Sequence, residues 1–136
     1  MGKKVLKIIA IDTNIFIYFY QAHPHFGQKS KEWFEKLRKG ELRGVTSIIT
    51  KAELLSFKQP PKVIKSLKEQ FESTPNLIVC EVNDNVAVKT AELRRKYGFR
   101  LPDAIQLATA IILKVNAFLT NDENLRKCKE IEVIVL

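Results

Sequence analysis

Lys7-Ile8-Ile9-Ala10-Ile11-Asp12-Thr13-Asn14 is the stretch that decides which fold we expect. An apolar run, Val5–Ile11, stops abruptly at a carboxylate, and a second apolar-rich run, 15–19, follows with the pattern of an amphipathic helix. Buried parallel strands read as continuous β-branched runs, and α/β proteins bind their ligands just beyond the carboxyl ends of such strands. We therefore expect Asp12 to lie where such a fold keeps its chemistry.

The length and composition predict an ordinary globular protein. The 136 residues are enough for one domain, 1–136, with a substantial core, and 46% of them are hydrophobic. No uninterrupted apolar run approaches the roughly 18 residues that a membrane-spanning helix needs. The N-terminal apolar run contains Lys7 and ends at Asp12 without a small-residue cleavage site, so we expect a cytoplasmic protein.

The charged residues indicate partners and possible sites. The formal net charge of +8 favours a polyanion such as nucleic acid, or an acidic protein, as a partner. Of the 15 acidic residues only four are Asp, namely Asp12, Asp84, Asp103 and Asp122. Because Glu and Lys form the solvated surface, each Asp needs its own explanation as a helix cap or a metal ligand. We expect Asp84 to cap its helix.

Short apolar runs alternate with helical periodicity along the chain. Strands are expected at Val5–Ile11, Gly44–Thr46, Leu77–Val82, Ala117–Thr120 and Glu132–Leu136. Helices are expected at Asn14–Tyr20, Gln28–Lys39, Ser47–Phe57, Pro61–Glu72, Asp84–Tyr97, Asp103–Lys114 and Asp122–Lys127. Ser47 is the expected N-cap of its helix, and the helix that begins at Asp103 is apolar nearly all round, which predicts a central buried position. This order predicts a three-layer α/β/α sandwich around a mostly parallel sheet of about five strands.

On this assignment, Asp12, Glu53, Asp103 and Asp122 all lie at the carboxyl-end rim of the sheet, although they come from four separate segments. Four carboxylates brought together repel one another unless a cation neutralises them. Ligands that are all oxygen favour Mg²⁺ or Mn²⁺, which keep bound waters that can act as nucleophiles. The competing interpretation is that Asp12, Asp103 and Asp122 are only helix caps. Glu53 is harder to explain in that way, because apolar residues flank it on a helix that must face the core.

Four segments together resemble the PIN-domain ribonucleases, and within them the VapC-type toxins. They are Ile11-Asp12-Thr13-Asn14, Thr50-Lys51-Ala52-Glu53-Leu54, Leu101-Pro102-Asp103-Ala104-Ile105-Gln106-Leu107-Ala108-Thr109-Ala110 and Phe118-Leu119-Thr120-Asn121-Asp122. The resemblance implies that Asp12 and Asp103 touch a metal ion directly and that Glu53 and Asp122 act partly through water. It also implies that Thr13, Asn14, Thr120 and Asn121 support the acids or orient the substrate.

The same resemblance implies a metal-dependent endoribonuclease that leaves 5′-phosphate and 3′-hydroxyl ends. As a VapC-like toxin it would be a homodimer, held inactive by an antitoxin whose C-terminal segment blocks the acidic groove. Arg94 and Arg95 are candidate contacts to RNA phosphates, although such charges are more often the wet face of a helix. His23 and His25 flank Pro24 in a loop that could approach the site, but an oxygen-only site needs no imidazole.

The sequence leaves several alternatives to be weighed. The nuclease could serve housekeeping RNA processing without a toxin role, and a small antitoxin gene beside its own would separate the two. A receiver domain or an aspartyl-phosphate phosphatase fits poorly, since Asn14 stands where the phosphatase motif needs a second Asp. A non-catalytic binding module would bind RNA without a metal and without cleavage.

Overall fold

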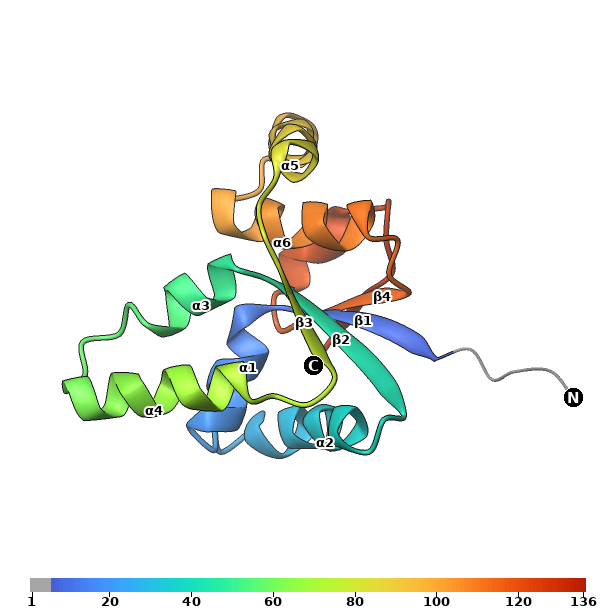
Figure 1. Ribbon diagram of the computed structural model, residues 1–136. Helices are drawn as coiled ribbons and strands as arrows, with labels where there is room; N and C mark the ends of the chain where they lie inside the picture. The colour runs from blue at the N-terminus through green and yellow to red at the C-terminus, as the bar shows by residue number, and fades with distance from the viewer. Residues whose placement is uncertain (1–5) are drawn as a thin grey trace, which may run out of the picture.

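The computed structural model describes residues 6–136, and its centre is a five-stranded sheet in the order β3-β2-β1-β4-β5 (Figure 1). Every neighbouring pair of strands is parallel. The strands are β1 (Lys7–Ile11), β2 (Leu42–Ser47), β3 (Leu77–Cys80), β4 (Ala117–Thr120) and β5 (Val133–Val135). Because the chain order reverses direction on either side of β1, the crevice at the carboxyl ends of β1 and β4 is the topological switch point, where such folds bind ligands.

Helices cover both faces of the sheet, which confirms the predicted α/β/α sandwich (Figure 1). Helices α5 and α6 pack on one face, helices α1, α2 and α4 pack on the other, and α3 follows the carboxyl end of β2. Their bounds are α1 (Thr13–Tyr20), α2 (Gly27–Arg38), α3 (Ile49–Leu54), α4 (Pro61–Glu72), α5 (Asp84–Tyr97) and α6 (Leu101–Ile112), with a 3₁₀ helix, η1 (Glu123–Lys127), after β4.

The side chains of strand β1 point alternately to the two faces of the sheet and so pack into two separate cores. Ala10 packs with Leu107 and Ala108 under α6, whereas Ile9 and Ile11 pack on the other face. The positions from 104 to 110 of α6 are all buried, as its apolar sequence predicted. Helix α6 therefore presses directly on the sheet and brings its first turn to the switch point.

Several predicted boundaries were wrong. Helix α3 ends at Leu54 instead of Phe57, and Ser47 does not occupy its N-cap, although the Ser47 hydroxyl accepts the Ile49 N–H at 3.2 Å. Asp84 is not the cap of α5. Asn83 holds that position and accepts the Val86 N–H at 2.9 Å, since an Asn side chain reaches the same donor as an Asp. Val5 lies outside the described residues.

Strand β3 is largely exposed although its sequence is a short apolar run. It forms one edge of the sheet and pairs only with β2, so Ile78 and Val79 are exposed and Cys80 is half-buried. An apolar run alone does not distinguish a central strand from an edge strand, because position in the sheet depends on the whole topology. No helix among residues 6–136 is long and apolar enough to cross a membrane.

Candidate active site at the carboxyl end of the sheet

Asp12 is the centre of the site, at the end of β1 and at the N-cap of α1. One carboxylate oxygen, Oδ1, accepts the Thr13 N–H at 2.8 Å. The other, Oδ2, accepts the hydroxyl of Thr120 at 2.7 Å, from the end of the neighbouring strand β4. Only 6% of Asp12 is exposed. Asp12 is therefore a helix cap, as the competing interpretation of the sequence held. The same carboxylate also joins two strand ends at the switch point.

The charge of Asp12 is poorly stabilised. The pKa of its carboxyl group is raised from 3.8 to about 6, chiefly by burial and also by the negative charges of Asp103 and Glu53, while the bonds from Thr120 and Thr13 lower it. Asp103 and Glu53 therefore lie close enough to Asp12 for mutual repulsion. Asp103 and Glu53 act on the charge of Asp12 although they come from α6 and α3, and the role of these acids as metal ligands stays a prediction.

Glu53 is held by a chain of buried hydroxyl groups. The Thr13 hydroxyl donates to Oε1 of Glu53 at 2.7 Å, and the Thr46 hydroxyl donates to the carbonyl of Ile11 at 2.7 Å. Thr50 lies between them, 2.7 Å from the Thr46 hydroxyl and 3.1 Å from that of Thr13. Because the Thr46 proton is already committed to Ile11, Thr50 must be the donor to Thr46.

Gln106 on α6 supplies the remaining protons of this network. Its Nε2 donates to the Thr50 hydroxyl at 2.7 Å and to the Thr13 hydroxyl at 3.2 Å, and its Oε1 accepts the Ser47 N–H at 3.3 Å. The amide thus directs one donor chain through Thr50 and Thr46 into β1 and another through Thr13 to Glu53. In a buried network each bond polarises the next, so Glu53 is held as an acceptor at the end of the chain.

Asp103 and Asp122 occupy the rim of the site. Asp103 lies in the first turn of α6, and its Oδ2 accepts a hydrogen bond from Nε of Arg100 at 3.0 Å. Asp122 is the N-cap of η1, where its Oδ1 accepts the Asn124 N–H at 2.9 Å. Its own N–H donates to the Thr120 hydroxyl at 3.1 Å, which links Asp122 to the group that holds Asp12.

The acids have the chemistry of a hard-cation site, but their side chains are engaged elsewhere. Among residues 6–136 no three His, Cys, Asp or Glu side chains lie close enough together to hold one metal ion as they stand. The available donors are carboxylate oxygens, which fit Mg²⁺ or Mn²⁺, and the raised pKa of Asp12 marks negative charge that a cation would neutralise.

The two asparagines assigned to the site differ in their bonding. Asn121 donates from Nδ2 to the Tyr18 hydroxyl at 2.7 Å, which ties the loop after β4 to α1. The side-chain oxygen of Asn14 is buried without a hydrogen-bond partner among the described residues. Such an orphaned acceptor next to Asp12 is available to a ligand that enters the site.

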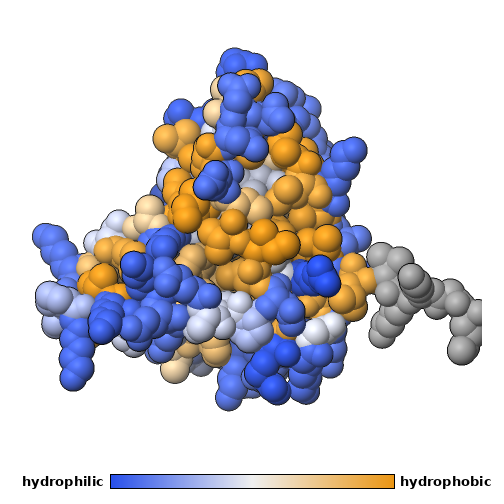
Figure 2. Space-filling view, viewed as in Figure 1, coloured by the Kyte–Doolittle hydropathy of each residue, from blue (hydrophilic) through white to orange (hydrophobic). Residues whose placement is uncertain are grey.

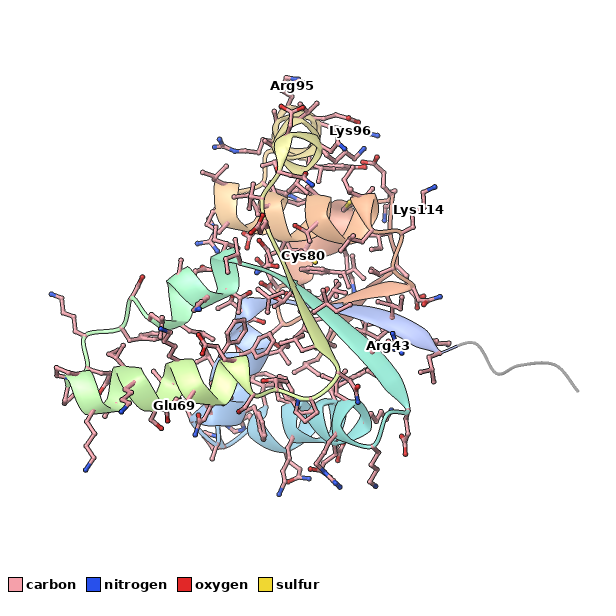
Figure 3. All side chains as sticks on the ribbon, viewed as in Figure 1. Arg43, Glu69, Cys80, Arg95, Lys96 and Lys114 are labelled. Atoms are coloured by element: carbon pink, nitrogen blue, oxygen red, sulfur yellow. The ribbon has the colours of Figure 1, made fainter. Side chains whose placement is uncertain are left out.

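Arg94 and His23 make hydrogen bonds to backbone groups outside this cluster. Arg94 donates from Nε to the Phe99 carbonyl at 3.3 Å, and Arg95 projects from α5 away from the sheet (Figure 3). The Nδ1 atom of His23 accepts the N–H groups of His25 and Phe26, each at 3.1 Å. His23 therefore stabilises its own loop, and the role of Arg94 and Arg95 in RNA binding stays a prediction.

Sequence reasoning missed Gln106, Thr46, Thr50 and Arg100. Gln106 carries an amide in the middle of a largely apolar helix, which was a signal that it needs a buried partner. Thr46 and Thr50 resemble ordinary strand and helix residues and gave no such signal. Arg100 stands three residues before Asp103, the spacing of an ion pair on one face of a helix.

We predict that the hydroxyl network stabilises the fold through Thr50. Thr50→Val is nearly isosteric but removes the donor to Thr46 and leaves the Gln106 amide short of an acceptor, so we expect a loss of about 1–3 kcal/mol of unfolding free energy in urea titrations. Thr109→Val is the matched control, because the hydroxyl of that equally buried residue only donates to Ile105 of its own helix. We expect it to lose less than about 1 kcal/mol. Equal losses in the two variants would contradict the network.

We also predict an unusual pH dependence from Asp12. Because folding raises its pKa, the folded protein binds the proton more tightly than the unfolded chain, so stability falls as pH rises from about 4 through about 6. The full effect is on the order of 3 kcal/mol. In urea titrations with EDTA, Asp12→Asn should therefore be more stable than wild type at pH 8, and the difference should be smaller at pH 5. A pH-independent difference for Asp12→Asn would contradict the prediction.

Comparisons with known proteins agree with this fold. The PIN domain family model matches residues 9–131. No curated protein sequence shows significant similarity to the chain. Among solved structures, VapBC2 of Rickettsia felis bound to a promoter DNA fragment is similar with a TM-score of 0.76 and 20% identity, covering 94% of this chain and 98% of that chain. DNA-bound VapBC of Salmonella typhimurium is similar with a TM-score of 0.74 and 19% identity, covering 96% of this chain and 98% of that chain. A toxin–antitoxin complex of Klebsiella pneumoniae is similar with a TM-score of 0.70 and 22% identity, covering 93% of this chain and 96% of that chain.

At these identities the solved structures establish the shared fold, and the family model spans nearly all of the described chain, including the segments that carry Asp12, Glu53, Asp103 and Asp122. The chain belongs to the PIN domain family.

Proposed function

We propose that the protein is a divalent-metal-dependent endoribonuclease that hydrolyses RNA phosphodiesters. The observation that carries the proposal is the cluster of Asp12, Asp103 and Glu53 at the switch point, where burial and mutual repulsion raise the pKa of Asp12. A fold gains nothing from gathering these charges unless a cation joins them. Membership of the PIN domain family and the surplus of basic residues both support RNA as the substrate.

Each acid has a role in this proposal. Bound Mg²⁺ or Mn²⁺ supplies positive charge that attracts a phosphodiester and lowers the pKa of water. Asp12 and Asp103 hold the ion directly, and Glu53 and Asp122 act partly through water. The two bonds from Thr13 and Thr120 fix the Asp12 carboxylate before the ion arrives, so little reorganisation is needed. The free oxygen of Asn14 and the amide of Asn121 orient the substrate.

The expected reaction is hydrolysis by in-line attack of water on phosphorus. The new P–O bond forms as the bond to the 3′ oxygen breaks, and that oxygen takes up a proton. The products would carry a 5′-phosphate and a 3′-hydroxyl. No side chain forms a covalent intermediate.

We further propose that the nuclease is a VapC-like toxin, neutralised in the cytoplasm by a cognate antitoxin. The similar solved structures are toxin–antitoxin complexes, which supports such a partner. The net charge of +8 favours acidic stretches in the antitoxin. A cavity of about 410 Å³ between α1, α2 and the end of α4, lined partly by Phe19, Tyr20 and Phe34, offers room for its apolar side chains.

We also propose a homodimer through the edge patch, which we define as Ile48, Ile78, Val79 and Val82. All four are exposed, and the backbone N–H of Ile48 donates to Cys80, so that the start of α3 adjoins β3. Figure 2 shows the apolar surface over the middle of the molecule, where β3 forms the edge of the sheet. A contiguous apolar surface beside an unpaired strand edge favours association with a second copy.

The first test of the enzyme is cleavage of a pool of structured cellular RNAs with Mg²⁺, Mn²⁺ or EDTA. We expect wild type to cut with either metal and not with EDTA, and Asp12→Asn to lose at least about 100-fold in rate, since a charge-stabilising group is removed from the site. Asp84→Asn keeps an Asp-sized side chain outside the cluster and should cut normally. Cutting that survives both EDTA and Asp12→Asn, or metal-independent RNA binding without cleavage, would refute the proposal.

The dimer is tested by a charge placed in the edge patch. Ile78→Lys introduces a desolvated charge at the proposed interface, so we expect a shift from dimer to monomer in sedimentation equilibrium at micromolar concentration. Val63→Lys on α4 is the control, because Val63 is also exposed but lies outside the patch. A monomeric wild type, or a dimer unaffected by Ile78→Lys, would show that this edge is not the interface.

A further inference from the structure

Arg100 is a cation placed inside the rim of the acidic site. Its Nε atom donates to Oδ2 of Asp103 at 3.0 Å. The bond to Asp103 raises the pKa of the guanidinium, and the charges of Asp103, Asp122 and Glu53 all act in the same direction. Three of the four acids assigned to the site therefore lie close enough to act on the charge of this one side chain.

The pair that Arg100 forms is easily broken. The side chain of Arg100 is 78% exposed, whereas that of Asp103 is only 13% exposed. An exposed ion pair of this kind contributes little to stability, because water screens it and a long side chain must be ordered. Asp103 is thus sheltered within the site, while its partner can turn into solvent without unpacking any core residue.

Local structure does not explain why an arginine stands here. Arg100 is the N-cap of α6 and makes no side-chain capping bond. Ser, Thr, Asn or Asp would satisfy a free N–H of the first turn, and a cation at this end of a helix is opposed by the helix dipole. A residue that is locally unfavourable beside a functional cluster indicates a functional requirement.

We propose that Arg100 is an exchangeable cation of the site. It pairs with Asp103 until Asp103 ligates a metal ion, and the freed guanidinium then binds a phosphate of the incoming RNA. The inference rests on the proposed nuclease function and adds to it a substrate-binding residue and a built-in competitor for the metal.

Two physical arguments support the exchange. The Asp103 carboxylate already accepts a hydrogen bond from Arg100, so the guanidinium would compete with a metal ion for this group. RNA must also bring its phosphates toward a cluster of carboxylates, and a planar guanidinium at the rim offsets that repulsion and can bind phosphate oxygens in pairs. Removal of Arg100 should therefore strengthen metal binding and weaken RNA binding, two effects of opposite sign.

The test compares wild type, Arg100→Ser, Arg100→Lys and Arg38→Ser. Arg38 is the matched control, an exposed arginine that pairs with Glu35 at 2.9 Å with the same i,i+3 spacing but on α2. Mn²⁺ affinity is measured by titration calorimetry without RNA. RNA affinity is measured by fluorescence anisotropy of a short labelled single strand at saturating Ca²⁺, with a gel to show that the RNA stays intact.

For Arg100→Ser we expect the Mn²⁺ dissociation constant to fall about fivefold, because a positive charge leaves the site. The RNA dissociation constant should rise about tenfold, and the slope of log affinity against log salt should decrease by about 0.7, the value for one phosphate contact on a single strand. The melting temperature should be unchanged or higher, since serine is the better cap. Arg100→Lys should retain part of the RNA affinity, and Arg38→Ser should match wild type.

The inference fails if Arg100→Ser weakens Mn²⁺ binding, leaves RNA binding unchanged, or melts at a lower temperature than wild type, because the arginine would then be structural. Wild type that cuts RNA while Arg100→Ser behaves like Arg38→Ser would overturn this inference alone. Wild type that binds neither Mn²⁺ nor RNA would overturn the proposed function together with it.

Discussion

The hydrogen bond from the Thr120 hydroxyl to the Asp12 carboxylate, 2.7 Å long, is the interaction on which the site depends. It joins the ends of β1 and β4, the two neighbouring strands at which the chain reverses its direction across the sheet. The same Thr120 oxygen accepts the N–H of Asp122, so one hydroxyl sets the positions of two acids. A parallel sheet supplies this arrangement without long loops, because all of its strands end at one edge.

Around that bond, the fold brings negatively charged side chains near one another and holds them with hydrogen bonds. Asp12 keeps a raised pKa because desolvation outweighs the bonds that favour its charged form. Thr120 fixes the carboxylate of Asp12 by a direct hydrogen bond. The Gln106 amide helps to fix the carboxylate of Glu53 indirectly, because it directs the Thr13 hydroxyl toward it. The acids at the switch point stabilise the fold less than apolar side chains in the same place would. The stability of the fold therefore comes from the two apolar cores on either side of the sheet.

Much of this arrangement could be read from the sequence, because it depends on local features. Asp12 follows an apolar run and Asp103 follows Pro102 at a helix start, so the position of each is fixed by the element that it ends or begins. The burial of β3 could not be predicted, because an apolar strand does not reveal whether it will lie at an edge. Asn83 and Asp84 compete for the same cap, and their chemistry alone does not decide between them. The contact between Gln106 and Thr13 spans 93 positions and exists only after the helix packs on the sheet.

The site therefore consists of two layers with different origins. Asp12, Asp103 and Asp122 are placed by strand ends and helix starts, and Glu53 is placed by the last turn of α3. Their partners, Gln106 from within α6 and Arg100 from just before it, come from one helix that packs against β2 and β4. A shift of α6 along the sheet would change the support of Glu53 and the pairing of Asp103 together. Because the positions from 104 to 110 of α6 are buried, such a shift would disrupt core packing, and the two acids are held in a fixed relation by the core itself.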